Sequence, residues 1–174
     1  MLAAAGAALL VSGAARAEVA DKSAAGFEII EQVEIKAPRA KVWEAVQHPE
    51  AWWSSRHTFS GDAKNLSLDP AKGCFCEALP NGFVQHMGLI YSDGFSTLRL
   101  EGALGPLSFT GAMGHMSFIL REAAGGKTTL TVSYEVGGYA KGGLAEQWAA
   151  PVDAVLGEQV ARLQDYVETG KVGR

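Results

Sequence analysis

Apolar and polar residues alternate along several stretches of the chain, which is the pattern of half-buried β-strands. The clearest stretch is residues 128–136, where Leu130 and Val132 share one face and Thr131 and Glu135 share the other. Further strands are predicted over residues 27–36, 66–68, 74–79, 83–91, 95–101 and 109–121. Turn-forming Gly, Pro, Asn and Asp residues separate most of these stretches, so consecutive strands are expected to pair as an antiparallel sheet.

Two short helical segments are predicted after the first strand. Pro38 suits the first position of a helix, because its φ angle is already fixed there and it lacks an N–H that would go unused. This helix is expected to end at His48, since Pro49 pushes the preceding residue out of the helical region. A second short helical turn is expected at Trp52 and Trp53.

Residues 144–169 form the longest predicted helix. Apolar residues recur there at steps of three and four and give a single apolar stripe: Val152, Val155, Leu156, Val160, Leu163 and Val167. Pro151 is expected to divide a short first piece, which carries Trp148, from the main helix, and Gly170 is expected to end it. The Gly-rich residues 137–143 are expected to form a flexible connection before it.

A sheet with one apolar face needs a cover, and the last helix is the only predicted element long enough to supply it. The predicted fold class is α+β, with an antiparallel sheet of about six or seven strands, a long C-terminal helix, and two short helices after the first strand. The 174 residues suffice for one compact core and are too few for two ordinary domains.

The N-terminal residues have the composition of a secretory signal. Residues 2–15 are apolar or small and uncharged, and Ala15-Arg16-Ala17 has the small-x-small form of a cleavage site. We therefore predict a signal peptide over residues 1–17, a flexible lead-in over 18–26, a domain over 27–170 and a tail over 171–174, in a periplasmic or secreted protein. The alternative is a disordered Ala-rich arm, because no Lys or Arg follows Met1.

Charge excludes some classes of partner. The formal net charge is −4, which argues against nucleic acid and against an anionic membrane surface, both of which need basic residues. The apolar N-terminal stretch is shorter than the roughly 20 residues that span a bilayer, so no stable membrane insertion is expected.

Cys74 and Cys76 are the only cysteines. In a regular strand their Cα atoms would lie about 6.5–7 Å apart, at or past the limit for an unstrained disulfide. This geometry favours two small buried thiols, and the alternative is a strained, reducible bond in an oxidising compartment.

Candidate catalytic groups are few. No spacing links His48, His57, His86 and His115 to one another or to the cysteines, so neither a metal site nor a required cofactor is expected. The carboxylate, imidazole and phenol side chains within the predicted strands remain as weak acid–base candidates: His86, Tyr91, Glu77 and Tyr134. No Ser-His-Asp arrangement is present to support nucleophilic catalysis.

A larger set of apolar side chains is predicted to line a binding site. These side chains are bulky or adaptable, and most of them would be needed to fill the core in any case. They are Trp52, Trp53, Met87, Leu89, Leu98, Leu100, Met113, Met116, Phe118, Tyr134 and Trp148. Trp148 precedes the main helix, and the Gly-rich segment ahead of it could act as a lid.

The motifs resemble those of the START-related, or SRPBCC, superfamily. The resemblance covers residues 27–168 and rests on Pro49, Glu50, Trp52 and Trp53 and on the Gly-x-Phe of residues 73–75. The most similar branch is named after the activator of the heat-shock-protein ATPase and overlaps polyketide cyclase/dehydrase-like proteins. The resemblance implies a helix-grip fold, in which a curved sheet wraps the last helix around an apolar cavity, and it implies small-molecule binding. No co-chaperone motif transfers residue by residue.

Three functions follow from this pattern. The first is binding of a small apolar or amphipathic molecule, such as a lipid, an isoprenoid or an aromatic compound, without a cofactor. The second is an enzyme of cyclase, dehydratase or hydrolase type that uses the same cavity. The third is a protein-interaction module, which would need a large exposed apolar patch on the outer face of the sheet and whose protein partner is unknown.

Overall fold

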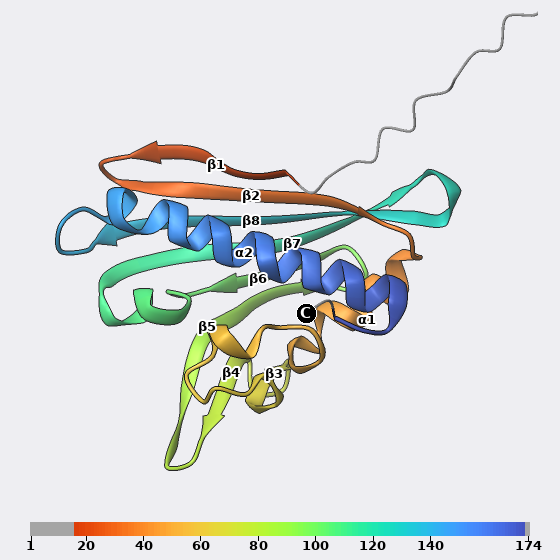
Figure 1. Ribbon diagram of the computed structural model, residues 1–174, viewed down its shortest axis with the longest axis horizontal. Helices are drawn as coiled ribbons and strands as arrows, with labels where there is room; N and C mark the ends of the chain where they lie inside the picture. Colours follow the sequence, from red (N-terminus) through yellow and green to blue (C-terminus); the bar gives the residue numbers. More distant parts are fainter. Residues whose placement is uncertain (1–15, 173–174) are drawn as a thin grey trace, which may run out of the picture.

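A single antiparallel sheet of eight strands forms the body of the molecule, in the spatial order β1-β2-β8-β7-β6-β5-β4-β3 (Figure 1). This computed structural model describes residues 16–172. The strands are β1 (Arg16–Ser23), β2 (Gly26–Ile35), β3 (Leu66–Asp69), β4 (Cys74–Leu79), β5 (Gly82–Asp93), β6 (Thr97–Glu101), β7 (Gly111–Ala123) and β8 (Lys127–Tyr139). The chain joins most neighbouring strands through tight turns, as the alternating pattern predicted.

Two α-helices and several short 3-10 turns complete the fold. Helix α1 (Arg39–Val46) follows β2, and α2 (Leu144–Thr169) follows β8. The 3-10 turns are η1 (Pro49–Ala51), η2 (Ser55–His57), η3 (Ala63–Asn65), η4 (Gly105–Phe109) and η5 (Ala124–Gly126). Helix α2 ends at Gly170, whose left-handed backbone accommodates the final turn.

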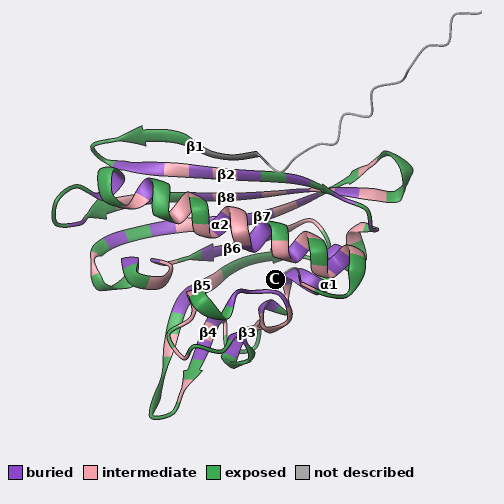
Figure 2. Cartoon of the chain, viewed as in Figure 1, coloured by how far each residue is buried: buried purple, intermediate pink, exposed green. Residues whose placement is uncertain are grey.

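Helix α2 lies across one face of the sheet and contacts β1, β2, β8 and α1 (Figure 1). Buried residues of the strands and of α2 belong to one core cluster, and Figure 2 shows buried segments along both. Leu156, Val160, Leu163 and Val167 are buried on α2, which confirms the predicted stripe along its second half. The arrangement is the α+β helix-grip fold that the sequence predicted, with eight strands rather than six or seven.

Three local features differ from the sequence predictions. Residues 18–23, expected to be a loose lead-in, belong to β1, which pairs antiparallel with β2. Pro151 does not divide the last helix, which runs unbroken because Ala149 and Leu156, on either side of it, both pack into the core. Strand β8 extends to Tyr139 and so includes part of the predicted Gly-rich connection. The predicted signal peptide lies almost entirely in residues 1–15, outside the described part of the chain.

One carboxyl group is buried between the sheet and α2, away from the strand ends. Glu31 of β2 is fully buried, and neither of its carboxyl oxygens has a hydrogen-bond partner within residues 16–172. Burial raises the pKa of Glu31 to about 7, and the nearby charge of Asp153 on α2 raises it further in the same direction. Glu31 is therefore largely protonated below neutral pH.

Within residues 16–172, no helix combines the length and apolarity that crossing a bilayer requires.

Candidate functional site

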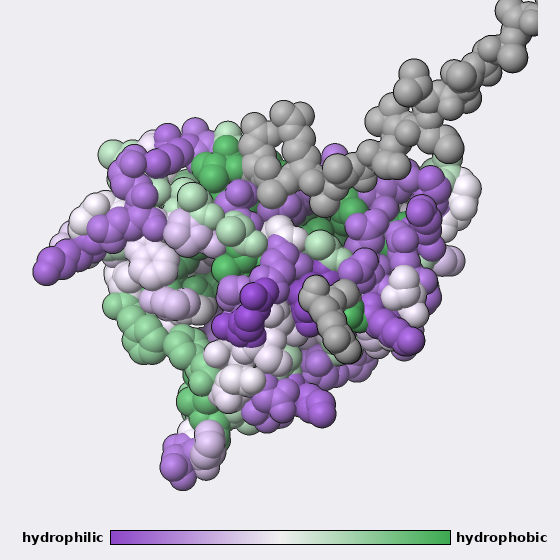
Figure 3. All heavy atoms as spheres, viewed as in Figure 1, coloured by the Kyte–Doolittle hydropathy of each residue, from purple (hydrophilic) through white to green (hydrophobic). Residues whose placement is uncertain are grey.

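A cavity of about 270 Å³ lies between the first half of α2 and the β4–β5 end of the sheet. Its walls come from the segment after η1, from β4 and β5, from the loop that leads to β7, and from α2. The lining is mostly apolar and consists of Trp53, Arg56, His57, Thr58, Phe59, Phe75, His86, Leu104, Gly105, Pro106, Leu107, Trp148, Pro151, Val152 and Val155. At the lower left of Figure 3, pale and green atoms of low polarity gather where this loop and the projecting β4–β5 hairpin lie in Figure 1.

Trp53 is held in the wall by hydrogen bonds of its two neighbours to α2. The carbonyl of Trp52 accepts a hydrogen bond from Nε of Arg162 at 2.8 Å. The amide of Ser54 donates to Oε1 of Gln159, also at 2.8 Å. These contacts place the segment after η1 directly against the helix.

His86 lies at a β-bulge in β5. Phe75 of β4 pairs with Met87, and the next residue, Cys76, pairs with Gln85, so His86 is the extra residue between these pairs. A bulge redirects a side chain. As a result, His86 and Met87 are both buried, although consecutive residues of a regular strand face opposite sides of the sheet.

The carboxylate of Glu77 on β4 binds the imidazole of His86. Oε2 of Glu77 lies 2.9 Å from Nε2 of His86, and both side chains are buried. The same carboxylate accepts hydrogen bonds from the amides of Phe59, at 3.1 Å, and Ser60. One buried anion thus joins the histidine to the segment that follows η2.

The electrostatics of this pair fix the position of its proton. Burial alone would raise the pKa of Glu77, but hydrogen bonds from Ser60, Phe59 and His86 outweigh it and hold the pKa below its usual range. Burial lowers the pKa of His86, against the opposing effect of Glu77. Near neutral pH the pair is therefore a carboxylate and a neutral imidazole. Because a carboxylate can only accept, Nε2 carries the proton and Nδ1 carries the lone pair.

Nδ1 of His86 is buried and has no hydrogen-bond partner among the described residues. The ring of Phe59 stacks over the imidazole at a centroid distance of 5.8 Å, and the ring of Phe75 lies at 5.1 Å. Phe59 is 41% exposed and contacts Phe109 edge-on at 5.7 Å. A buried acceptor without a partner costs the folded protein about 1–3 kcal/mol. A ligand whose hydrogen-bond donor reached Nδ1 would remove this cost and would therefore bind more tightly.

Arg56 and His57 of the lining already have a partner in Glu158. Nη2 of Arg56 lies 2.9 Å from one carboxylate oxygen of Glu158, and Nε2 of His57 lies 3.1 Å from the other. Burial would raise the pKa of Glu158, but hydrogen bonds from Arg56, His57 and Ser54 hold the pKa below its usual range. The ion pair forms a polar border on an otherwise apolar cavity.

Tyr134 holds the loop that contributes Leu104 and residues 105–107 to the wall of the cavity. Its hydroxyl donates to the carbonyl of Gly102 at 3.0 Å and accepts from the amide of Leu104 at 2.9 Å. Burial raises the pKa of Tyr134 to about 12, so the hydroxyl stays protonated. A Cβ atom at Gly102 would lie 2.9 Å from the carbonyl oxygen of His86, so this position requires glycine.

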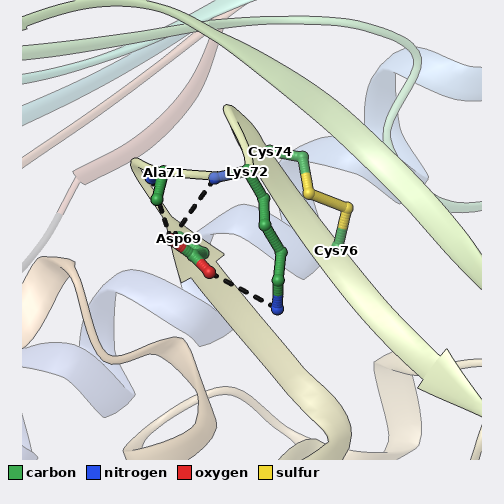
Figure 4. The surroundings of a disulfide bond; sticks show 5 residues. All are labelled: Asp69, Ala71, Lys72, Cys74 and Cys76. Atoms are coloured by element: carbon green, nitrogen blue, oxygen red, sulfur yellow. Dashed lines mark hydrogen bonds and ion pairs between the residues drawn. A yellow bond between two sulfur atoms is a disulfide. The ribbon is translucent and has the colours of Figure 1, made fainter.

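Cys74 and Cys76 form a disulfide on β4, which corrects the favoured prediction of two free thiols (Figure 4). Their Cα atoms are 5.4 Å apart, closer than in a regular strand, and the pairing of β4 with β5 is irregular at the same place, between Phe75 and Cys76. The enclosed residue, Phe75, is a wall of the cavity. The disulfide therefore constrains the backbone on both sides of a cavity residue.

The turn that leads into this disulfide is held by Asp69 (Figure 4). Oδ1 of Asp69 accepts a hydrogen bond from the amide of Ala71 at 2.9 Å, and Oδ2 lies 3.4 Å from Nζ of Lys72. The hydrogen bond from Ala71 is the main reason that the pKa of Asp69 is lowered. Lys72 lowers this pKa further, whereas burial opposes both effects.

The structure brings only part of the predicted site together. Trp53 and Trp148 line the cavity, as does His86, and Glu77 lies directly behind His86. The other buried members of the predicted set belong to the core and do not line the cavity: Trp52, Met87, Leu98, Leu100, Met116, Phe118 and Tyr134. Leu89 is partly buried against the core, whereas Met113 and Tyr91 are exposed and lie outside the cavity.

Sequence reasoning missed the walls that come from irregular segments. Phe59 and residues 104–107 have no periodic pattern that could place them. Phe75 lines the cavity from its position between the two cysteines, and the Gly-x-Phe and Cys-x-Cys motifs were the available signals for it. Among the residues that the structure describes, no three His, Cys, Asp or Glu side chains cluster as a metal site would need.

Several solved structures share this fold at low sequence identity. EF2215 from Enterococcus faecalis, a conserved protein of unknown function, is 16% identical, with a TM-score of 0.57 over 91% of this chain and 80% of that one. CalU16 from Micromonospora echinospora is 14% identical, with a TM-score of 0.54 over 90% of this chain and 85% of that one. DynU16, from the dynemicin biosynthetic locus, is 23% identical, with a TM-score of 0.52 over 84% of this chain and 49% of that one. No family model matches the chain, and no curated protein sequence is similar to it.

Proposed function

We propose that this protein binds a small hydrophobic or amphipathic molecule, such as a lipid, an isoprenoid or an aromatic compound, in the cavity beside α2. The observation that carries the proposal is the cavity itself, whose walls are apolar apart from Arg56, His57, Thr58 and His86. Ligand sites in proteins are typically concave and apolar with a few placed polar groups. The likeness of the fold to CalU16 and DynU16 supports the same proposal.

Tryptophan fluorescence tests this function directly, because Trp53 and Trp148 line the cavity. We expect saturable changes in emission when 1-naphthol, farnesol or dodecanoic acid is titrated, with at least one of the three binding. Trp148→Phe should reduce the change. Trp43→Phe is the matched control, since Trp43 is buried in α1 against Phe95 and lies outside the cavity. No saturable change with any of the three compounds would contradict the proposal.

The Glu77–His86 pair supports a second candidate, an enzyme of cyclase, dehydratase or hydrolase type. In such an enzyme Nδ1 of His86 would take a proton from the substrate, and Glu77 would stabilise the imidazolium that results. The test is exchange of the C2 protons of 1-tetralone in D2O. Faster exchange with the protein than with buffer, lost in His86→Phe, would favour catalysis, and equal rates would favour binding alone.

We also propose that the protein is exported to the periplasm or secreted. The disulfide supports this, because disulfides persist in oxidising compartments. Cleavage after Ala17 would leave residues 18–23 of β1 to pair with β2. Expression with and without residues 1–17, followed by cell fractionation and measurement of the intact mass, tests the proposal. An uncleaved protein in the cytoplasmic fraction would contradict it.

A further inference from the structure

Resting on the proposed function, we propose that the bound molecule is a neutral hydroxylated aromatic compound, whose O–H group donates a hydrogen bond to Nδ1 of His86. The proposal narrows the ligand to one chemical class and assigns His86 as the residue that selects it. Four observations lead to it, concerning size, ring shape, charge and access.

The volume of the cavity suits two fused rings. A protein cavity of about 150 Å³ holds one benzene ring. The cavity here has about 270 Å³, which leaves room for a second ring and a substituent.

The walls favour a flat ring over a flexible chain. Four aromatic side chains line the cavity, namely Trp53, Phe59, Phe75 and Trp148. Aromatic rings pack against one another in stacked or edge-to-face contacts, which stabilise the pair beyond the burial of area alone. A rigid ring also loses less conformational entropy on binding than an acyl chain does.

The charges favour a neutral donor over an anion. The group with unmet hydrogen-bonding capacity is an acceptor, Nδ1 of His86, and the carboxylate of Glu77 lies on the other side of the same ring. A carboxylate on the ligand would bring a second acceptor towards Nδ1 of His86 and a second negative charge towards Glu77. Arg56 and His57 already bind Glu158, so an anionic ligand would have to compete with that carboxylate for them. A hydroxyl group supplies the missing donor without a charge.

Access to Nδ1 depends on Phe59. This residue stacks over the imidazole and is 41% exposed, so its ring can rotate towards solvent at the cost of its contacts with His86 and Phe109. The ligand would then lie beside His86 with its hydroxyl group in the plane of the imidazole, where the lone pair of Nδ1 points. The backbone of Phe59 would stay where it is, because its amide is bound to Glu77.

Three probes of similar shape test the proposal by isothermal titration: naphthalene, 1-methoxynaphthalene and 1-naphthol. The methoxy compound keeps the oxygen and removes the donor. We expect 1-naphthol to bind about tenfold more tightly than 1-methoxynaphthalene, the effect of one buried hydrogen bond. In His86→Phe this preference should disappear while naphthalene still binds.

Each outcome separates this inference from the proposed function. Equal affinity for 1-naphthol and 1-methoxynaphthalene, or a preference that persists in His86→Phe, would overturn the inference and leave the binding function standing. Failure of all three probes to bind would overturn the inference and would also exclude an aromatic ligand. Binding of farnesol or dodecanoic acid would then still support the proposed function.

A measurement on the unaltered protein covers the case in which His86→Phe does not fold. The ¹⁵N resonance of Nδ1 of His86 is sensitive to a hydrogen bond accepted by its lone pair. We expect 1-naphthol to shift this resonance and 1-methoxynaphthalene to leave it in place. Equal responses to the two compounds would overturn the inference.

Discussion

The hydroxyl of Tyr134 lies 2.9 Å from the amide nitrogen of Leu104, and this contact fixes one wall of the cavity from within the core. Tyr134→Phe removes this hydrogen bond and the one to Gly102 while it keeps the ring. We expect a loss of roughly 1–3 kcal/mol in the free energy of unfolding, measured in urea, because two backbone groups lose their partner. We also expect weaker binding of 1-naphthol. Tyr139→Phe is the control, because Tyr139 is 72% exposed, and it should change neither quantity.

Glu77→Gln tests the buried pair from the side of the anion. The amide keeps the shape of the side chain but removes the charge to which the amides of Phe59 and Ser60 donate. Hydrogen bonds to charged groups contribute about 1.5–3 kcal/mol, so we expect a loss of that order in the free energy of unfolding. Glu101→Gln, at an exposed position on β6, should have no measurable effect.

The pH dependence of that loss has a definite sign. The pKa of Glu77 is lower in the folded protein than in the unfolded chain, as is the pKa of His86. Their contributions to stability are therefore complete above the unfolded pKa values, 4.5 and 6.5, and disappear as the pH falls through the folded values. Thermal unfolding of the wild type and Glu77→Gln should converge at acid pH. A difference that is constant from pH 3 to 8 would contradict this assignment.

Glu31 has the opposite effect on stability. Its pKa is about 7 in the folded protein against 4.5 for the unfolded group, so the folded state loses stability as the pH rises between these values. Glu31→Gln cannot ionise, and we expect it to be more stable than the wild type by roughly 2–3 kcal/mol at pH 8 and little changed at pH 4. Urea unfolding at the two pH values measures the difference. Equal effects at both would show that burial of the charge is not the cause.

The disulfide gives a prediction on the cavity wall. A bridge between residues two apart in sequence closes a very short loop, so its loss should cost only about 1–2 kcal/mol of stability. Loss of the disulfide should affect ligand affinity more than it affects stability, because Phe75, between the two cysteines, lines the cavity. We expect dithiothreitol to weaken 1-naphthol binding by the wild type. Cys74→Ser/Cys76→Ser should bind as weakly as the reduced protein and should not respond to the reductant.

The regular part of the fold could be predicted because each element repeats one pattern. In β8 the alternation of Leu130 and Val132 with threonines is strict, and in α2 the stripe that includes Leu163 and Val167 has helical spacing. Such patterns report burial of one face, which is what the sheet and its helix share. They placed both elements within a few residues of their observed bounds.

The site itself could be predicted only in part, because its geometry depends on irregularities. Strict alternation puts His86 and Met87 on opposite faces, and the bulge that buries both has no signal in the sequence. Tyr134 was assigned to the cavity wall but acts behind it, through hydrogen bonds to a loop that has no periodicity. The cysteine spacing was also misjudged, since the observed Cα–Cα distance of 5.4 Å is shorter than the distance in a regular strand.

The carboxylate of Glu77 has a consequence for how the parts of the site communicate. It binds the imidazole of His86 and the backbone of residues 59–60 at the same time, so the imidazole that lines the cavity and the segment beside it share one anion. A change in the strength of the hydrogen bond between Glu77 and His86 therefore changes the hydrogen bonds from the amides of residues 59–60 to the same carboxylate. A ligand that makes the imidazole a better donor to Glu77 therefore alters the order of that segment. Conversely, a substitution that loosens the segment is expected to alter affinity through the same anion, even where it touches no ligand atom.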